Sequence, residues 1–135
     1  MRIRTLATAG AVALASLGVS LGAAGTAGAA STAESCTPGY ACLYYNSDYK
    51  GAFYRQYFDI PNYASYYFSA SAAGSAGAGL PVKNNTASVD NWDFDFGIRQ
   101  YFNSNYSGVS QSIPKGGQAN LNASLKNDNA SGKFY

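Results

Sequence analysis

The sequence predicts an all-β domain assembled from two copies of one small unit, and three observations carry that prediction. All twelve tyrosines lie beyond residue 38, in short runs such as YACLYYN and AFYRQYF that glycine, proline and asparagine interrupt. Nothing in this region repeats with the 3.6-residue period of an amphipathic helix. The stretch YYNSDYKG at 44–51 returns as YFNSNYSG at 101–108 with five of eight residues identical. Aromatic runs cut by turn residues are typical of short strands, and a repeated phrase indicates a duplicated unit.

Residues 1–29 have the pattern of a secretory signal peptide. Arg2 and Arg4 open the chain, small apolar residues fill 6–21, and AGA at 27–29 has the A-x-A form of a cleavage site. The alternative, a transmembrane helix, fits less well because the run is short and rich in small residues. We therefore expect a secreted, extracellular protein whose mature part, about 105 residues, forms one domain.

Charge and composition exclude several classes of function. The chain has nine basic and seven acidic residues. Two of the basic residues belong to the leader, so the mature chain is near neutral. It lacks the basic surface that nucleic acid or an anionic membrane requires, and we expect neither partner. The chain has no histidine, the commonest general base, and we expect no enzyme. Asp90 precedes Asp93 and Asp95, which alternate with Phe94 and Phe96; this favours an extended connector over a catalytic carboxylate pair.

The first repeated phrase has the form Tyr-x4-Tyr-x-Gly. It comprises Tyr44, Tyr49 and Gly51 in the first copy and Tyr101, Tyr106 and Gly108 in the second. The residues between the tyrosines are Asn, Ser and Asp, which favour turns by bonding their own backbone. The glycines are expected to supply a positive φ or a close approach to a neighbouring ring. We interpret each phrase as a folded β-hairpin plugged by an aromatic side chain.

A second phrase also occurs twice, as KNNTASVDNW from Lys83 and KNDNASGKFY from Lys126. The first phrases are 57 residues apart and the second phrases 43, so the first copy is 14 residues longer. The Gly/Ala/Ser stretch at 69–81 accounts for most of that difference and is expected to be a flexible loop.

The second phrase is rich in side-chain oxygens, which are the ligands that calcium takes. The candidate ligands are Asn84, Asn85 and Ser88 in the first copy and Asn127, Asp128 and Ser131 in the second. Because only Asp128 is a carboxylate, the expected calcium affinity is weak, with a dissociation constant on the order of 10⁻⁴ to 10⁻³ M. The alternative is that these Asn and Ser residues only cap turns.

Cys36 and Cys42 are the only cysteines. In a secreted chain they predict a disulfide, which would fasten the N-terminal segment and contribute on the order of 2 kcal/mol for so short a loop.

Together the two phrases resemble the βγ-crystallin Greek-key motif. Its aromatic-x4-aromatic-x-Gly signature is matched at 44–51 and 101–108, and NNTASV and NDNASG match the first five positions of the calcium loop of its microbial members. Both loops depart at the sixth position, where Val89 and Gly132 replace serine. The resemblance implies a sandwich of two Greek keys with calcium sites that draw on both motifs.

More narrowly, CTPGYACLYYNSDYKG, GGQANL and KNDNAS resemble the secreted bacterial proteins of peptidase inhibitor family 36. That resemblance implies a monomer that inhibits thermolysin-type metalloproteinases with a substrate-like loop, so the implied partner is a secreted protease. Leu80 and Val82 are the candidate apolar anchors. The chain departs from the family in lacking a second disulfide to stiffen the loop, so a calcium-binding structural or surface module without inhibitory activity is the alternative function. A third hypothesis is polysaccharide binding by exposed aromatic side chains.

We expect a single domain over 36–135, with one Greek key at about 40–92 and the other at about 96–135. The implied architecture is two four-stranded sheets packed face to face, each key lending a strand to the other's sheet. The side chains expected in the core are Leu43, Tyr45, Phe53, Val89, Trp92, Ile98, Phe102, Leu121, Leu125 and Phe134.

Overall fold

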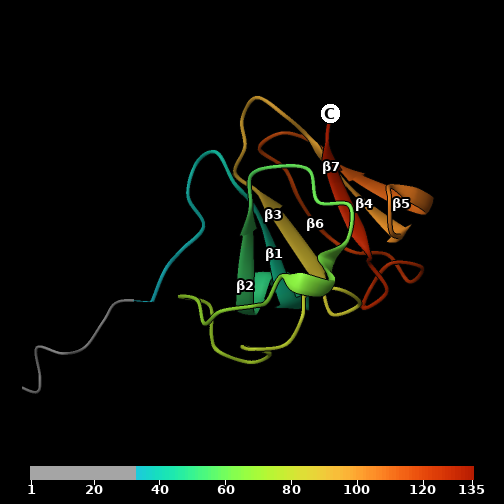
Figure 1. Ribbon diagram of the computed structural model, residues 1–135. Helices are drawn as coiled ribbons and strands as arrows, with labels where there is room; N and C mark the ends of the chain where they lie inside the picture. The colour runs from blue at the N-terminus through green and yellow to red at the C-terminus, as the bar shows by residue number, and fades with distance from the viewer. Residues whose placement is uncertain (1–32) are drawn as a thin grey trace, which may run out of the picture. The chain divides into compact units, whose positions relative to one another are not determined.

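The computed structural model describes residues 33–135, so the signal peptide predicted at 1–29 lies outside the described residues. Seven strands and two short 3₁₀ turns make up this part of the chain (Figure 1). The strands are β1 (Ala41–Asn46), β2 (Lys50–Gln56), β3 (Ser88–Asn91), β4 (Ile98–Asn103), β5 (Ser107–Ile113), β6 (Gln118–Asn120) and β7 (Ser131–Phe134), and the turns are η2 (Ser47–Tyr49) and η3 (Tyr63–Ser65). Within residues 33–135, no helix has the length and apolar character needed to cross a bilayer.

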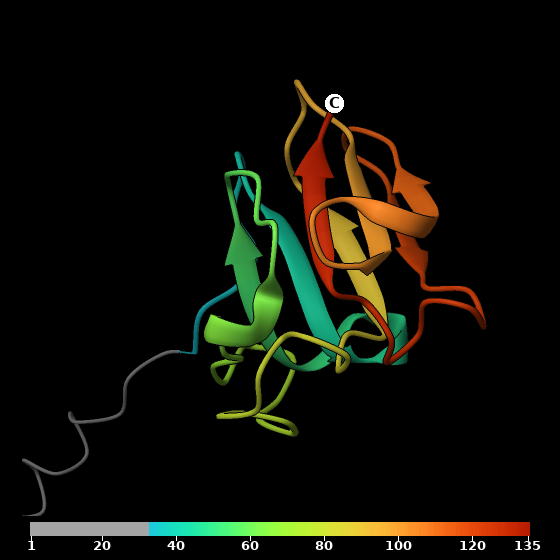
Figure 2. The same cartoon turned by 45° about the vertical axis from the view of Figure 1, so that its right-hand side comes forward.

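The strands form two antiparallel sheets, with the orders β2-β1-β3-β6 and β5-β4-β7. Figure 2 shows β7 and β4 standing beside the sheet that contains β1. The edge strand β6 comes from the second copy but pairs with β3 of the first. This is the strand exchange expected of paired Greek keys.

The reciprocal exchange is much smaller than expected. The first copy forms a β-bridge with the second sheet at Ile60, whose N–H donates to the carbonyl of Gly132 at 2.9 Å and whose carbonyl accepts in return at 3.0 Å. The expectation of two four-stranded sheets is therefore wrong for the second sheet, which has three strands and one isolated bridge. Beyond this bridge the chain leaves the strand, and the next backbone hydrogen bond between the two segments joins the Tyr63 N–H to the Ala130 carbonyl at 2.9 Å.

The two hairpins repeat one another in detail. Asn46 pairs with Lys50 across the first turn and Asn103 with Ser107 across the second, after the same irregularity in register. The positive φ predicted for the two motif glycines is observed, at +84° and +85°. In each hairpin the two motif tyrosines meet edge to face, with ring centroids 6.4 Å apart in the first copy and 6.0 Å in the second. The repeated phrase therefore encodes one repeated local structure.

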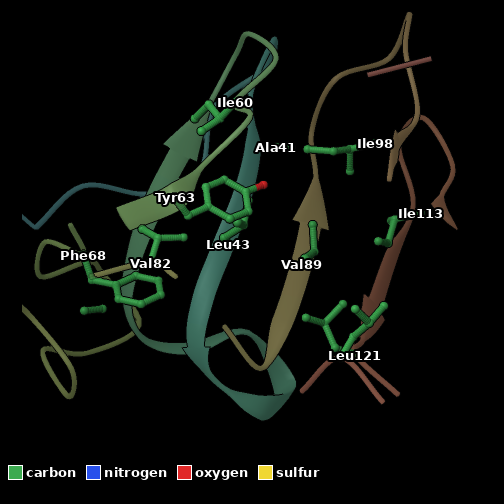
Figure 3. Close-up of a cluster of buried hydrophobic side chains, with 12 residues drawn as sticks. Ala41, Leu43, Ile60, Tyr63, Phe68, Val82, Val89, Ile98, Ile113 and Leu121 are labelled. Atoms are coloured by element: carbon green, nitrogen blue, oxygen red, sulfur yellow. The ribbon is translucent and has the colours of Figure 1, made fainter. Parts of the chain in front are cut away.

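The core lies between the sheets (Figure 3). Of the predicted core residues, Leu43, Phe53, Val89, Ile98, Leu121 and Leu125 are buried, and Tyr45 and Phe134 are half-buried. Two predictions are wrong, because Trp92 is 39% exposed and Phe102 is 44% exposed. Trp92 follows the end of β3, where its indole N–H donates to the Asp90 carboxylate at 2.9 Å. Phe102 lies in the irregular part of the β4–β5 pairing.

The insertion at 69–81 explains why Tyr45 is half-buried while its counterpart Phe102 is exposed. Gly77 lies against the Tyr45 ring so closely that a Cβ there would overlap it. The Phe68 ring, just before the insertion, meets Tyr45 edge to face at 6.0 Å. The second copy has no such insertion, so Phe102 is left without a cover.

The segment at 69–81, expected to be a flexible loop, makes regular backbone contacts with its neighbours. The segment runs along β2, where the carbonyls of Ala73 and Ala76 accept hydrogen bonds from the first residues of that strand, and Ser69 exchanges two with Phe53. The buried Ser71 hydroxyl donates to the Gly51 carbonyl at 2.7 Å. Small residues let this backbone lie close to the strand, which side chains of ordinary size would prevent.

A chain of fully buried polar side chains joins the two copies. The Tyr63 hydroxyl donates to Gln56 at 2.6 Å and accepts from Gln100 at 2.9 Å. Asn129 donates to Thr86 at 2.9 Å and contacts the Gln100 carboxamide oxygen at 3.4 Å. Burial raises the pKa of the Tyr63 phenol. Because each partner comes from a different segment, this network specifies how the two Greek keys align.

The predicted disulfide between Cys36 and Cys42 is present, with Cα atoms 6.0 Å apart. It fastens the segment before β1 to that strand. The same segment is held further along by Glu34, whose carboxylate pairs with Arg55 at 2.9 Å.

The connector at 92–97 differs from its expected form. Asp93 does not belong to a regularly alternating strand, because its Oδ1 accepts hydrogen bonds from the N–H groups of Asp95 and Phe96, both at 2.9 Å, in a tight turn. Phe94 and Phe96 are both more than half exposed, at 58% and 54%. The alternating polar and apolar faces expected from the sequence are therefore not formed.

Candidate cation-binding pockets

The second phrases of the two copies lie against each other. The N–H of Asn84 donates to the Asn129 carbonyl at 2.7 Å, and the N–H of Asn127 donates to the Thr86 carbonyl at 2.9 Å. Asn84 and Asn127 both have left-handed backbones, with φ of 61° and 62°, a conformation that asparagine tolerates better than most residues. This exchange puts the oxygen-rich loops of both copies side by side.

Two pockets flank the paired loops. The first, of about 490 Å³, is lined by Tyr45, Asn46, Ser47, Asn85, Ala87, Lys126 and Asn127. The second, of about 270 Å³, is lined by Lys83, Asn84, Phe102, Asn103, Ser104, Asp128 and Ala130. Every residue of one pocket has its counterpart in the other at the sequence offsets of the two phrases. Each pocket therefore combines the hairpin turn and loop of one copy with the loop of the other.

The donor set of the first pocket consists of amide and hydroxyl groups. The Asn85 side-chain nitrogen donates to the carbonyls of Pro81 at 2.9 Å and Lys83 at 3.3 Å. Because the nitrogen is engaged in this way, the carboxamide oxygen is left as the available acceptor. Ser47 and Asn127 add further oxygens to the pocket wall.

The second pocket contains the only carboxylate of the two, that of exposed Asp128. Lys83 also reaches into this pocket, where its Nζ donates to the Ser104 hydroxyl at 3.4 Å. In the first pocket Lys126 occupies the equivalent place in the wall. Within residues 33–135, no three carboxylate, cysteine or histidine side chains come together to hold a metal. The oxygens suit a hard cation, and their low charge suits only weak binding.

The structure places two of the predicted ligands elsewhere. Ser88 and Ser131 are fully buried and line neither pocket. The Ser88 hydroxyl donates to the Asn46 carbonyl at 2.6 Å and accepts from the Tyr49 N–H at 3.0 Å. Ser131 makes the matching pair of bonds in the second hairpin, at 2.7 and 3.1 Å. Both serines therefore stabilise a hairpin turn through these contacts.

The two candidate protease anchors have opposite environments. Leu80 is 41% exposed, whereas Val82 is fully buried in the core. Val82 is therefore withdrawn as a protease-facing residue, because a side chain packed between the sheets cannot enter another protein's cleft.

Sequence reasoning missed part of both pockets. Asn46, Ser47 and their counterparts Asn103 and Ser104 line the pocket walls, whereas the sequence predicts for them only a role in forming the turns. The available signal was that the first phrase repeats its polar residues as faithfully as its aromatic ones.

Comparison with known proteins supports the fold and leaves the narrower family unsupported. A scan against models of protein families finds no match, and no curated protein matches the chain. Among solved structures, a domain from work on the evolution of the eye lens βγ-crystallin fold aligns with a TM-score of 0.58 at 12% identity, covering 78% of this chain and 93% of its own. The N-terminal domain of protein S aligns with a TM-score of 0.52 at 18% identity, covering 71% and 94%.

At 12% and 18% sequence identity, these two similarities support a shared fold and no shared function. The protein has the βγ-crystallin fold, as the repeated motif predicted. The inhibitor family has no support from these neighbours.

Proposed function

We propose that the protein is an extracellular βγ-crystallin-type module that binds calcium weakly in its two pockets and is stabilised by it. One observation carries the proposal: two pockets related by the internal repeat, each lined by oxygen-bearing side chains from both Greek keys. Asn85 and Asn127 would contribute to the first site, and Asn84 and Asp128 to the second. Calcium supplies no chemistry here beyond cross-linking loops that meet only in the folded state.

The thermodynamic consequence is a concentration-dependent gain in stability. A ligand that binds only the native state stabilises it by RT ln(1 + [L]/Kd). For one site with a dissociation constant of about 1 mM, 10 mM calcium contributes about 1.4 kcal/mol. In a domain of this size that raises Tm by about 5–10 °C.

The test is the melting temperature of the protein in 0 to 10 mM calcium, with magnesium as the ionic-strength control. We expect a rise with calcium that exceeds the rise with magnesium, and Asp128→Asn should remove part of it. Asp95→Asn is the matched control, since Asp95 is an exposed carboxylate outside both pockets. Equal curves in calcium and magnesium would contradict the proposal.

A second candidate function, inhibition of a thermolysin-type protease, is favoured by one observation. The 69–81 segment lacks a disulfide but is fastened to β2 by backbone hydrogen bonds, and it presents Leu80 at 41% exposure. A held loop loses less conformational entropy on binding than a free one. Titration of a zinc protease and, in parallel, a serine protease tests it. Stoichiometric loss of zinc-protease activity with the chain intact on a gel supports inhibition, and cleavage within the loop contradicts it.

A further inference from the structure

A group of exposed aromatic side chains gathers at the end of the sandwich opposite the two pockets. The pockets lie at the β1–β2 and β4–β5 turns, whereas these rings follow the far ends of β2, β3 and β7. Tyr57, Phe58, Trp92, Phe94, Phe96 and Tyr135 are 39–64% exposed. Taking about 200 Å² for each ring, the six together expose roughly 600 Å².

Part of this surface is hollowed. A depression of about 360 Å³ is lined by the rings of Tyr57, Phe58, Phe96, Phe134 and Tyr135. We call it the aromatic hollow. The rings of Tyr57 and Phe58 meet at 87° with centroids 4.9 Å apart, so they form adjacent walls. Perpendicular walls enclose a compact group, whereas a sugar ring stacks best on a flat platform.

Two carboxylates complete the lining of the aromatic hollow, those of Asp59 and Asp93. Each uses Oδ1 to accept backbone hydrogen bonds: Asp59 from Phe134 at 2.9 Å, and Asp93 from the turn that follows it. Their positions are therefore held while Oδ2 makes no protein hydrogen bond in residues 33–135. No lysine or arginine lines the hollow, and in that same part of the chain the only ion pair joins Arg55 and Glu34.

Aromatic faces attract cations through the ring quadrupole, and carboxylates attract them by charge. The chain itself illustrates the first effect beside the hollow, where the Arg99 guanidinium lies 4.9 Å from the centroid of the Tyr135 ring. We infer that the aromatic hollow binds a basic side chain, lysine or arginine, of a partner protein. Because it lies away from the calcium pockets, this inference does not depend on the proposed function.

The test uses three capped peptides, Gly-Ser-Lys-Ser-Gly and its versions with Arg or Gln in the middle, titrated into the protein by NMR or calorimetry. We expect the Lys or Arg peptide to bind with a millimolar dissociation constant that weakens as salt is added, and the Gln peptide to bind at least about fivefold more weakly. Equal binding of all three peptides, or no binding at millimolar concentration, would overturn the inference.

Variants locate the site. Asp59→Asn and Asp93→Asn keep the Oδ1 acceptor and remove the charge, so each should weaken binding about fivefold without altering the melting curve. Asp48→Asn is the matched control at the other end of the sandwich, because Asp48 is exposed, also accepts a hydrogen bond through Oδ1, and lines neither the hollow nor the two pockets. For the rings, Phe96→Ala should abolish binding and Tyr67→Ala, a ring 56% exposed outside the hollow, should not. Unchanged affinity in the hollow variants, or capture of a neutral oligosaccharide that the Lys peptide cannot displace, would overturn the assignment.

Discussion

Replacing the lysine in each pocket by methionine is the sharpest perturbation of the candidate calcium sites. Methionine keeps an unbranched apolar side chain and removes the charge. Lys83 donates to Ser104 inside the second pocket, and Lys126 lines the first. An incoming cation would therefore meet a positively charged residue in the wall of each pocket. We expect Lys83→Met and Lys126→Met to tighten calcium binding rather than weaken it.

The magnitude follows from Coulomb's law. If the lysine charge lies about 6 Å from a divalent ion, the repulsion at the dielectric constant of water is about 1.4 kcal/mol. Salt screening over a Debye length of about 8 Å reduces this value at physiological ionic strength. Removing one lysine should thus strengthen binding at its own pocket by about three- to tenfold.

Calorimetric titration with calcium measures the change directly, and the calcium-dependent rise in Tm gives an independent readout. Lys115→Met is the control, because it changes the net charge equally at a residue that lines neither pocket. If Lys83→Met and Lys126→Met bind calcium no more tightly than Lys115→Met, the pockets do not hold the ion. If the lysine variants bind it more weakly, the lysines support the site and the electrostatic argument is refuted.

Three further predictions concern stability. Tyr63→Phe leaves Gln56 and Gln100 without their buried partner and should lower the free energy of unfolding by about 1–3 kcal/mol in denaturant titration; an unchanged midpoint would show that the network does not matter. Burial raises the pKa of Tyr54 to about 12 and also raises that of Tyr63. Unfolded tyrosine ionises near pH 10, whereas these buried phenols stay neutral to higher pH. Their contribution to the free energy of unfolding is therefore complete below about pH 10 and is lost as the pH rises toward 12. A Tm that does not change between about pH 10 and 12 would contradict this prediction. Deleting 133–135 removes the end of β7 with its bond to Asp59 and should unfold the domain, which native-like circular dichroism of the shortened protein would disprove.

The duplicated phrases made the fold predictable, because they combine a local signal with a global one. Tyr44, Tyr49 and Gly51 specify a hairpin through turn chemistry and a glycine at φ of +84°, both of which act over a few residues. Their recurrence at 101–108 then requires two such units, since one Greek key cannot bury its own apolar face. The disulfide followed as directly, from two cysteines in a chain with a predicted leader.

The candidate site was predictable only in part. Asn84, Asn85, Asn127 and Asp128 do line the pockets, because a loop rich in oxygens is visible in the sequence. Ser88 shares that pattern but is buried, since strand pairing turns its hydroxyl toward the hairpin. A motif gives the order of side chains along the chain and does not give the face on which each one lies.

By itself, the sequence determined the class of fold, the duplication and the loops rich in side-chain oxygens, because these depend on residue types and short spacings. Only the tertiary structure decided which side chains are buried and which segments bury them. The insertion at 69–81 shields Tyr45 and leaves Phe102 exposed, and chain segments far apart in sequence converge to form the aromatic hollow. Exposure and convergence arise from contacts between distant segments, and no local pattern records them.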